Sequence, residues 1–217
     1  KSELEEKNKD ITDSINYAKR IQEAILPSKE SILKVFPESF ILYKPKDIVS
    51  GDFYWFTETE DYYLIAAIDC TGHGVPGAFM SLIASTLIKE IVSGKKVYVP
   101  SQILQELNNS IIETLNQSDS ESSTRDGMDM SICCLDKKKS KLTFAGAARP
   151  LYFIRDNVLT DTKGQGYPIG GHYGLMNLPY SATVIDLQKG DMFYIFSAGY
   201  ADKFSAGDKK TFTTKRL

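Results

Sequence analysis

Short runs of apolar, β-branched and aromatic residues bounded by turn residues recur along most of the chain and predict β-strands. The run at 62–69 is apolar at nearly every position, which predicts a central strand buried on both faces. Residues 137–140 and Gly190-Asp191 are typical hairpin connections between neighbouring runs. The predicted strands are 39–43, 52–57, 62–69, 130–135, 141–145, 151–154, 182–187 and 192–196.

Two segments in the middle of the chain have a helical period instead. For residues 76–92 the pattern predicts one apolar face, formed by Phe79, Leu82, Ile83, Leu87 and Ile91. Ser101 is a plausible N-cap for a second helix, whose apolar stripe runs from residue 103 to residue 115. The polar stretch 116–125 is expected to be a surface loop. Strands, a helix pair and further strands indicate a mixed α+β domain with mainly antiparallel pairing.

Residues 1–27 form a separate predicted unit, a long helix that ends at Pro27-Ser28. Ile11, Ala18 and Ile25 fall seven residues apart, with Ser14 and Ile21 between them, which defines a heptad seam. Two explanations remain open. The helix packs on its own domain, or it is the end of a coiled-coil linker that joins an upstream sensor to the domain and pairs two chains.

Net charge and composition limit the partners and the cellular compartment that we expect for this chain. The net charge of −2 gives no electrostatic reason to expect nucleic-acid binding, and the sequence predicts no apolar run long enough to span a bilayer. The three cysteines, Cys70, Cys133 and Cys134, have no metal-type spacing, so we expect buried thiols and a cytoplasmic location for the domain. Because the chain begins with Lys, we expect a fragment, with any membrane or sensor segment lying upstream.

Two carboxylates carry the most distinctive chemistry, since Asp52 and Asp69 each stand at the edge of a predicted strand. Asp52 after Ser50-Gly51 is compatible with a turn residue that bonds local amides. Asp69 ends a buried run, where a charge needs a partner or a metal to offset its desolvation. The backbone carbonyl of Cys70 offers a further hard oxygen, and oxygen ligands favour Mg²⁺ or Mn²⁺.

Other chemistry is poorly supported. His73, in the Gly-rich turn after Asp69, is compatible with a catalytic, metal-binding or structural role, and His172 is expected in a surface loop. The sequence has no GxSxG elbow, no GxxxxGK[ST] loop and no GxGxxG after a strand.

Several motifs in order make the chain similar to a known family. SGDFYWF, AAIDCTGHGVPGAFMSLIAST, DGMDMSICCLD, LTFAGAARPLYFIR, YPIGG and GDMFYIFSAGYADKF together resemble the bacterial PPM-type (PP2C-like) serine/threonine phosphatases of the SpoIIE/RsbU group, over about residues 35 to 205. The resemblance implies an α-β-β-α sandwich over residues 35–217 with a Mg²⁺ or Mn²⁺ centre. It implies metal ligation by Asp52, Asp69 and the Cys70 carbonyl, with no side chain acting as nucleophile, because a water or hydroxide between the metals attacks the phosphorus.

Two departures from the family pattern concern this centre. Ala198, in Ser197-Ala198-Gly199, stands where the family carries a metal-binding Asp, and the final acidic motif and C-terminal strand are missing before Leu217. Ala147-Ala148-Arg149 also differs from relatives, which often have His or Asn there. We therefore expect a phosphatase domain with impaired activity, or alternatively a catalytically inactive module that binds a signalling partner.

The same resemblance implies the partners. The expected substrate is a phosphorylated anti-sigma-factor antagonist or a similar STAS-type protein, and an upstream sensor region is expected to act through the N-terminal helix. Homodimerisation through that helix is a further expectation.

Overall fold

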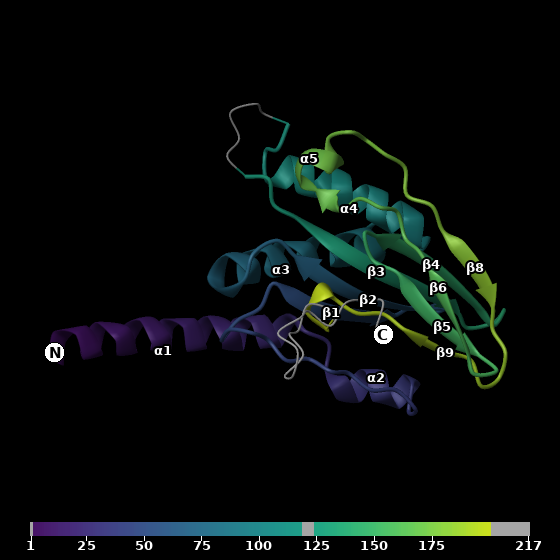
Figure 1. Cartoon of the computed structure of the whole chain (residues 1–217), viewed down its shortest axis with the longest axis horizontal. Coiled ribbons are helices and arrows are strands. Elements are labelled where there is room, and N and C mark those ends of the chain that lie inside the picture. The colour runs from purple at the N-terminus through teal and green to yellow at the C-terminus, as the bar shows by residue number, and fades with distance from the viewer. Residues whose placement is uncertain (1, 119–123, 201–217) are drawn as a thin grey trace, which may run out of the picture.

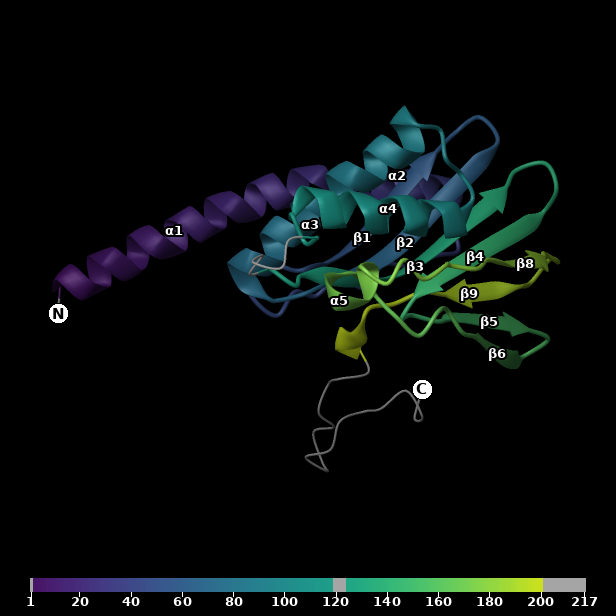
Figure 2. The same ribbon diagram turned by 90° about the horizontal axis from the view of Figure 1, so that it is seen from above.

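Two antiparallel sheets pack face to face in the computed structural model, which describes residues 2–118 and 124–200 (Figures 1 and 2). The large sheet has the order β1-β2-β3-β4-β8, with β7 also paired to β3, and the small sheet has the order β6-β5-β9. The strands of the large sheet are β1 (Asp52–Glu58), β2 (Tyr62–Cys70), β3 (Gly127–Asp136), β4 (Lys141–Ala147), β7 (Ile169–Gly170) and β8 (Thr183–Asp186). Those of the small sheet are β5 (Leu151–Arg155), β6 (Val158–Thr162) and β9 (Met192–Tyr194).

One face of the large sheet is covered by helices α3 (Gly74–Lys89) and α4 (Pro100–Thr114), with the π-helical turn η1 (Glu90–Gly94) extending α3 (Figure 1). On β2, side chains that face these helices alternate with less buried ones that face the other way. Burial of β2 on both faces is therefore wrong in its strict form, although β2 does lie inside the sheet between β1 and β3.

The helical segment formed by α3 and η1 buries only part of the predicted apolar face: Ile91 is 1% exposed, and Ile83 and Leu87 pack against the core. Ala84 and Ile88 are fully buried, whereas the side chain of Phe79 is 62% exposed. Small residues at Gly77, Ala78 and Ser81 allow this close packing, and a pattern of large apolar residues cannot show that. The stripe on α4 is confirmed, but the predicted cap is wrong, because Val99 precedes the helix and Pro100 begins it.

The prediction that no apolar run is long enough to span a bilayer is wrong for the segment Gly74–Gly94. By length and composition alone this described helix is long and apolar enough to cross a bilayer. Such a test is also passed by core helices, and here Ala84, Ile88, Ile91 and Val92 belong to the main buried cluster. The packing therefore assigns it to the core of the domain.

The opposite face of the large sheet is covered in two parts. Over β3 and β4 lies the small sheet, where Cys133 and Phe144 pack with Leu151. Over the start of the large sheet lie α2 (Lys29–Val35) and the chain that follows it, with Phe36 against Phe56 and Tyr63. Among the described residues, the helical outer layer of the predicted sandwich is seen on the large-sheet side.

A predicted strand at 39–43 is wrong, since residues 36–51 contain neither helix nor strand. Phe40 and Leu42 are 71% and 61% exposed, and β1 already forms the edge of the large sheet. Although this segment has a β-forming composition, it pairs with no strand in the described part of the chain, not even with the edge strand β1.

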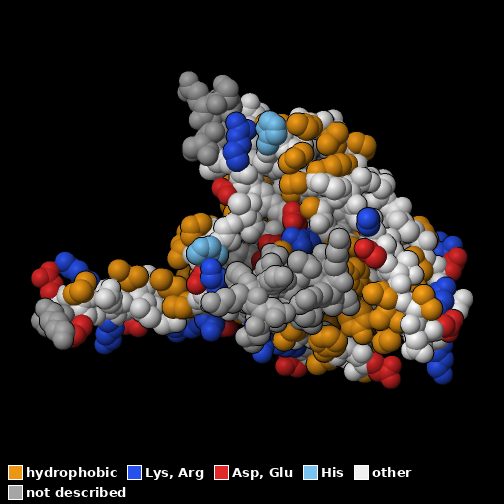
Figure 3. All heavy atoms as spheres, in the orientation of Figure 1, with side chains coloured by type: hydrophobic (Ala, Val, Ile, Leu, Met, Phe, Trp, Pro, Cys, Tyr) orange, Lys and Arg blue, Asp and Glu red, His pale blue; other side chains and the backbone are white. Residues whose placement is uncertain are grey.

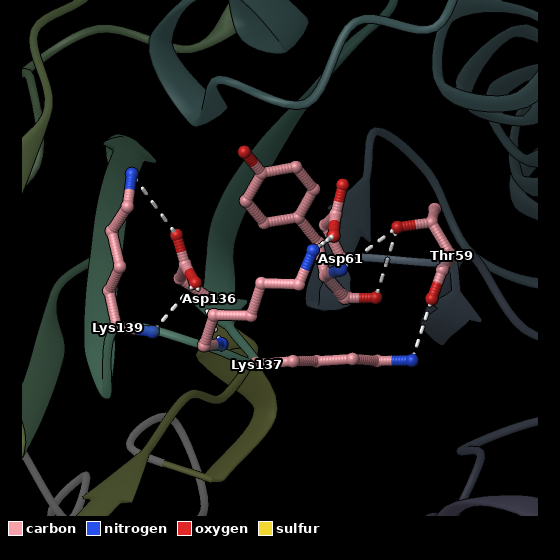
Figure 4. Close-up of polar contacts among 7 residues, drawn as sticks. Thr59, Asp61, Asp136, Lys137 and Lys139 are labelled. Atoms are coloured by element: carbon pink, nitrogen blue, oxygen red, sulfur yellow. Dashed lines mark hydrogen bonds and ion pairs between the residues drawn. The ribbon is translucent and has the colours of Figure 1, made fainter.

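The two predicted hairpins have different outcomes. Residues 137–140 do join β3 to β4, and this end of the sheet is tied to the β1–β2 turn by Lys137, whose ammonium donates to the Thr59 carbonyl, and by the Lys138–Asp61 ion pair (Figure 4). Gly190-Asp191, however, connects β8 in the large sheet to β9 in the small one. The second hairpin is therefore wrong, and its turn links the two layers.

Helix α1 (Ser2–Ile25) is confirmed, and its first half extends away from the domain (Figures 1 and 2). Only its end is anchored, chiefly by Gln22, which is 3% exposed. The predicted missing C-terminal strand concerns residues 201–217, which lie outside the described part of the chain.

Candidate functional site

Three carboxylates lie side by side at one edge of the large sheet. The strand register places Asp52 on β1 directly opposite Asp69 on β2, and Asp69 directly opposite Asp129 on β3. Directly opposed residues on neighbouring strands have Cβ atoms about 4.5–5.5 Å apart. The fold thus brings together the two acids that the sequence singled out and adds a third.

Among the residues that the structure describes, one guanidinium, that of Arg149, accompanies these acids. Nε and Nη2 of Arg149, which follows β4, both donate to Asp129 Oδ2, at 3.1 and 2.7 Å. Nη2 also lies 3.5 Å from Asp69 Oδ2. The side chain of Arg149 is only 17% exposed, so this is a largely buried ion pair. Acidic and basic side chains are seen next to each other near the middle of the face in Figure 3.

The segment before and at η2 (Ala198–Tyr200) contacts the other two acids. Ser197 Oγ donates to Asp52 Oδ2 at 2.7 Å, and the Ala198 backbone N–H donates to Asp69 Oδ2, also at 2.7 Å. The backbone of residue 198 therefore lies beside Asp69. With alanine there, the chain contributes a hydrogen-bond donor and no carboxylate.

Burial at this edge raises the pKa of two of the acids. Burial, together with the negative charge of Asp69, raises the pKa of Asp52 to about 6, against the opposing effect of the Ser197 hydrogen bond. Burial also raises the pKa of Asp129, although Arg149 opposes this shift. The site thus holds more negative charge than its single guanidinium neutralises, which favours a cation.

Two backbone oxygens, those of Cys70 and Gly72, lie close to the chain just before Asp52 because Gly51 and Gly77 have no side chain. A Cβ at Gly51 would lie 2.7 Å from the Gly72 carbonyl oxygen and 3.1 Å from that of Cys70, and a Cβ at Gly77 would lie 2.6 Å from the Gly72 oxygen. The Cys70 carbonyl is therefore next to the residue that precedes Asp52. Its thiol is buried, which raises the thiol pKa and leaves the sulfur out of ligation.

These donors fit a hard divalent cation. Carboxylate and carbonyl oxygens are what Mg²⁺ and Mn²⁺ prefer, and Mg²⁺ commonly keeps several waters. Within residues 2–118 and 124–200, no group of three His, Cys, Asp or Glu side chains is placed to bind a metal by side chains alone. Asp52, Asp69 and a carbonyl are the set that the geometry offers, because Asp129 is paired with Arg149.

The two histidines do not belong to the cluster of Asp52, Asp69 and Asp129. His73 stands at the start of α3, is mostly exposed, and its Nδ1 lies 2.8 Å from Asp47 Oδ2. This contact joins two loops, which is a structural role. His172 is exposed, as predicted, but lies on the short helix α5 (Gly171–Gly174) and not in a loop. Cys133 and Cys134 are free, buried thiols, which confirms that prediction.

Sequence reasoning missed Asp129 and the roles of Ser197 and Arg149. Asp129 is an acid within an otherwise apolar strand, between Met128 and Met130, which is the same signal that drew attention to Asp69. The contacts of Ser197 and Arg149 depend on long-range packing and leave no local pattern.

Both the structure and the sequence of the chain are similar to those of known proteins. The structure is similar to the SiaA-PP2C domain of Pseudomonas aeruginosa, with a TM-score of 0.84 and 33% identity, over 96% of this chain and 80% of that one. RsbX, solved in complex with magnesium, shares the fold at a TM-score of 0.55 and 16% identity, over 82% of this chain and 81% of that one. In sequence, the chain is 27% identical over 202 residues to the phosphoserine phosphatase RsbU of Bacillus subtilis (strain 168), covering 89% of this chain.

Fold and site together define a PP2C-type phosphatase domain. The family model of stage II sporulation protein E (SpoIIE) matches residues 59–217, and the chain belongs to this family. It spans 55% of the length of RsbU.

Proposed function

We propose that this domain is a metal-dependent protein phosphatase that hydrolyses phosphoserine or phosphothreonine on a signalling partner. The observation that carries the proposal is the register of β1 and β2, which sets Asp52 opposite Asp69 within a PP2C-type fold. The similarity to a phosphoserine phosphatase, RsbU, supports the chemistry.

Asp52, Asp69 and the Cys70 carbonyl would hold a Mg²⁺ or Mn²⁺ ion, in keeping with the magnesium complex of RsbX. Such an ion, when bound, activates water for attack and neutralises phosphate oxygens. The chain's own part is to orient the two carboxylates. Ser197 holds Asp52 and the Ala198 N–H holds Asp69, each through one hydrogen bond.

The proposed substrate is a phosphorylated anti-sigma-factor antagonist or a similar STAS-type protein, and the domain is proposed to act in the cytoplasm. Helix α1 is proposed to connect it to an upstream sensor. Support for this comes from Gln22 on α1, which bonds both backbone groups of Ser50, two residues before Asp52.

Ala198 is proposed to weaken the centre, because a methyl group stands where a ligand oxygen would complete the metal site. Replacing Ala198 by Asp is expected to tighten Mn²⁺ binding and to raise Mn²⁺-dependent hydrolysis of an aryl phosphate by about tenfold or more, the scale on which single partners of a metal site act. Asp161→Ser, at an exposed position on β6, is a control that should change neither.

Tighter binding without activity would leave a metal site that is not catalytic. If Ala198→Asp changes neither the affinity for Mn²⁺ nor the rate, position 198 is not a lost ligand position.

A catalytically inactive, partner-binding module is the second candidate, and one observation favours it. Both carboxylates already accept hydrogen bonds from the chain, from Ser197 and Ala198, so they are partly satisfied without a metal. The unmodified chain decides between the two functions. Mn²⁺-dependent release of phosphate from a phosphoserine protein supports the enzyme, whereas Mn²⁺ binding without turnover supports the module.

A further inference from the structure

Asp129 and Arg149 form the part of the carboxylate edge that the proposed metal ligands do not use. Asp129 has the same register relation to Asp69 as Asp69 has to Asp52. A second cation between Asp69 and Asp129 would therefore be as natural by geometry as one between Asp52 and Asp69. The structure fills that second position with a guanidinium.

The contacts of Arg149 are those of a fixed cation. Two of its nitrogens bond Asp129 Oδ2, and Nη2 extends to 3.5 Å from Asp69 Oδ2, so the positive charge spans both acids. The side chains of Arg149, Asp129 and Asp69 are 17%, 26% and 21% exposed, respectively. A guanidinium stays charged at all ordinary pH values, and breaking a buried pair by taking away one partner is strongly unfavourable.

An incoming divalent ion therefore meets two unequal positions. Between Asp52 and Asp69, its competitors are a hydroxyl, a backbone N–H and one nitrogen of Arg149, which lies 3.5 Å from Asp69 Oδ2. Between Asp69 and Asp129, it would have to displace the whole guanidinium from its two hydrogen bonds to Asp129 and meet the repulsion of that like charge at shorter range. A divalent ion can therefore bind between Asp52 and Asp69, but not between Asp69 and Asp129.

We propose that Arg149 takes the place of a second metal ion: it supplies a fixed positive charge to Asp69 and Asp129, and the centre accepts one divalent cation, at Asp52 and Asp69. This inference rests on the proposed metal centre and assigns the number of ions that it holds. The bound ion supplies one positive charge centre of the site, and the guanidinium of Arg149 supplies the other.

The test counts Mn²⁺ ions bound per chain at saturation, by the electron paramagnetic resonance signal of free Mn²⁺ during titration. The unmodified chain should bind one ion. Arg149→Met removes the guanidinium but keeps the length of the side chain, and it should bind a second ion. Arg149→Lys keeps a positive charge and should still bind one.

Arg155→Met is the matched control, because Arg155 pairs through the same two nitrogens with Asp191, at the end of the small sheet. It should bind one ion. Circular dichroism of each variant confirms that the fold is retained.

Two ions in the unmodified chain would overturn the inference while leaving the proposed metal centre intact, and this count stands even if Arg149→Met does not fold. A folded Arg149→Met chain that still binds one ion would also overturn it. No binding by either chain would instead overturn the metal centre itself, and the inference with it.

Discussion

Gln22 is the residue through which the N-terminal helix is coupled to the candidate site. Its side-chain amide donates to the Ser50 carbonyl and to Ser81 Oγ, and accepts from the Ser50 N–H. Ser50 in turn accepts a hydrogen bond from the Asp52 N–H through its hydroxyl. A chain of hydrogen bonds therefore leads from α1 to the first carboxylate, and all of Gln22's polar atoms are satisfied in the interior.

Replacing Gln22 by Ala should lower the free energy of unfolding by about 1–3 kcal/mol, because it leaves buried backbone groups of Ser50 without partners. Urea denaturation measures this change. Asn16→Ala, at an exposed position on the same helix, is the control and should be neutral or slightly stabilising. Equal stability of Gln22→Ala and the unmodified chain would show that water replaces these hydrogen bonds at no cost.

At the same scale, the sequence identified the acids that stand out against apolar neighbours and missed those defined by packing. Asp69 ends a nearly continuous apolar run, so its burial could be predicted locally. The pairing of Arg149 with Asp129 depends on residues 20 positions apart in the chain and on the register of two strands. No local pattern encodes such a contact.

Strands were predicted well where both their pattern and their neighbours in sequence agreed. Short turns join β1 to β2 and β3 to β4, so these two antiparallel pairs are local, whereas β2 pairs with β3 across the intervening helices α3 and α4. The exposed strand β6 was missed because all its residues are polar or solvent-facing. Pairing of β8 with β9 was wrongly expected, since a two-residue turn can also lead from one sheet to the other.

Arg155 holds that crossing between the sheets. From the end of β5 it donates to both oxygens of Asp191, at 2.8 and 2.6 Å, and to the Asp186 carbonyl at the end of β8. The hydrogen bond from Arg155 lowers the pKa of Asp191 to about 2 from an ordinary 3.8. Because the folded-state pKa is the lower one, this pair stabilises the fold above about pH 4 and ceases to do so as the pH falls through about 2.

Stability curves against pH should show this pair directly. The urea midpoint of Arg155→Met should lie below that of the unmodified chain near neutral pH, and the difference should shrink as the pH falls from about 4 to about 2. Asp161→Asn, an exposed acid on β6, should show no such convergence. A difference that stays constant down to pH 2 would contradict the pairing.

At the scale of the whole molecule, α1 carries two faces with different roles. Ile15 and Gln22 are partly or fully covered, and so is Ala18 of the seam, whereas the other apolar seam residues, Ile11, Ile21 and Ile25, are exposed. Apolar side chains are seen along this arm in Figure 3. The end of the helix packs on the domain, as the first explanation of the helix expects, and the pairing of two chains stays a prediction.

Pairing of two chains through this seam is a prediction that sedimentation can check. The unmodified chain should sediment as a dimer, and the double substitution Ile11→Asp and Ile21→Asp should give a monomer, because charges at seam positions oppose close helix contact. Asn16→Asp adds one charge outside the seam and should remain dimeric. A monomeric unmodified chain would show that the exposed seam has another purpose.

The proposed phosphatase activity depends on a divalent cation at Asp52 and Asp69. Isothermal titration with Mn²⁺ tests this most directly, on the unmodified chain, on Asp69→Asn, and on the exposed control Asp161→Asn. We predict saturable binding by the unmodified chain and the control, and a loss of about tenfold or more in affinity for Asp69→Asn. Equal affinity of all three chains for Mn²⁺ would contradict the assignment of this edge of the sheet as the metal centre.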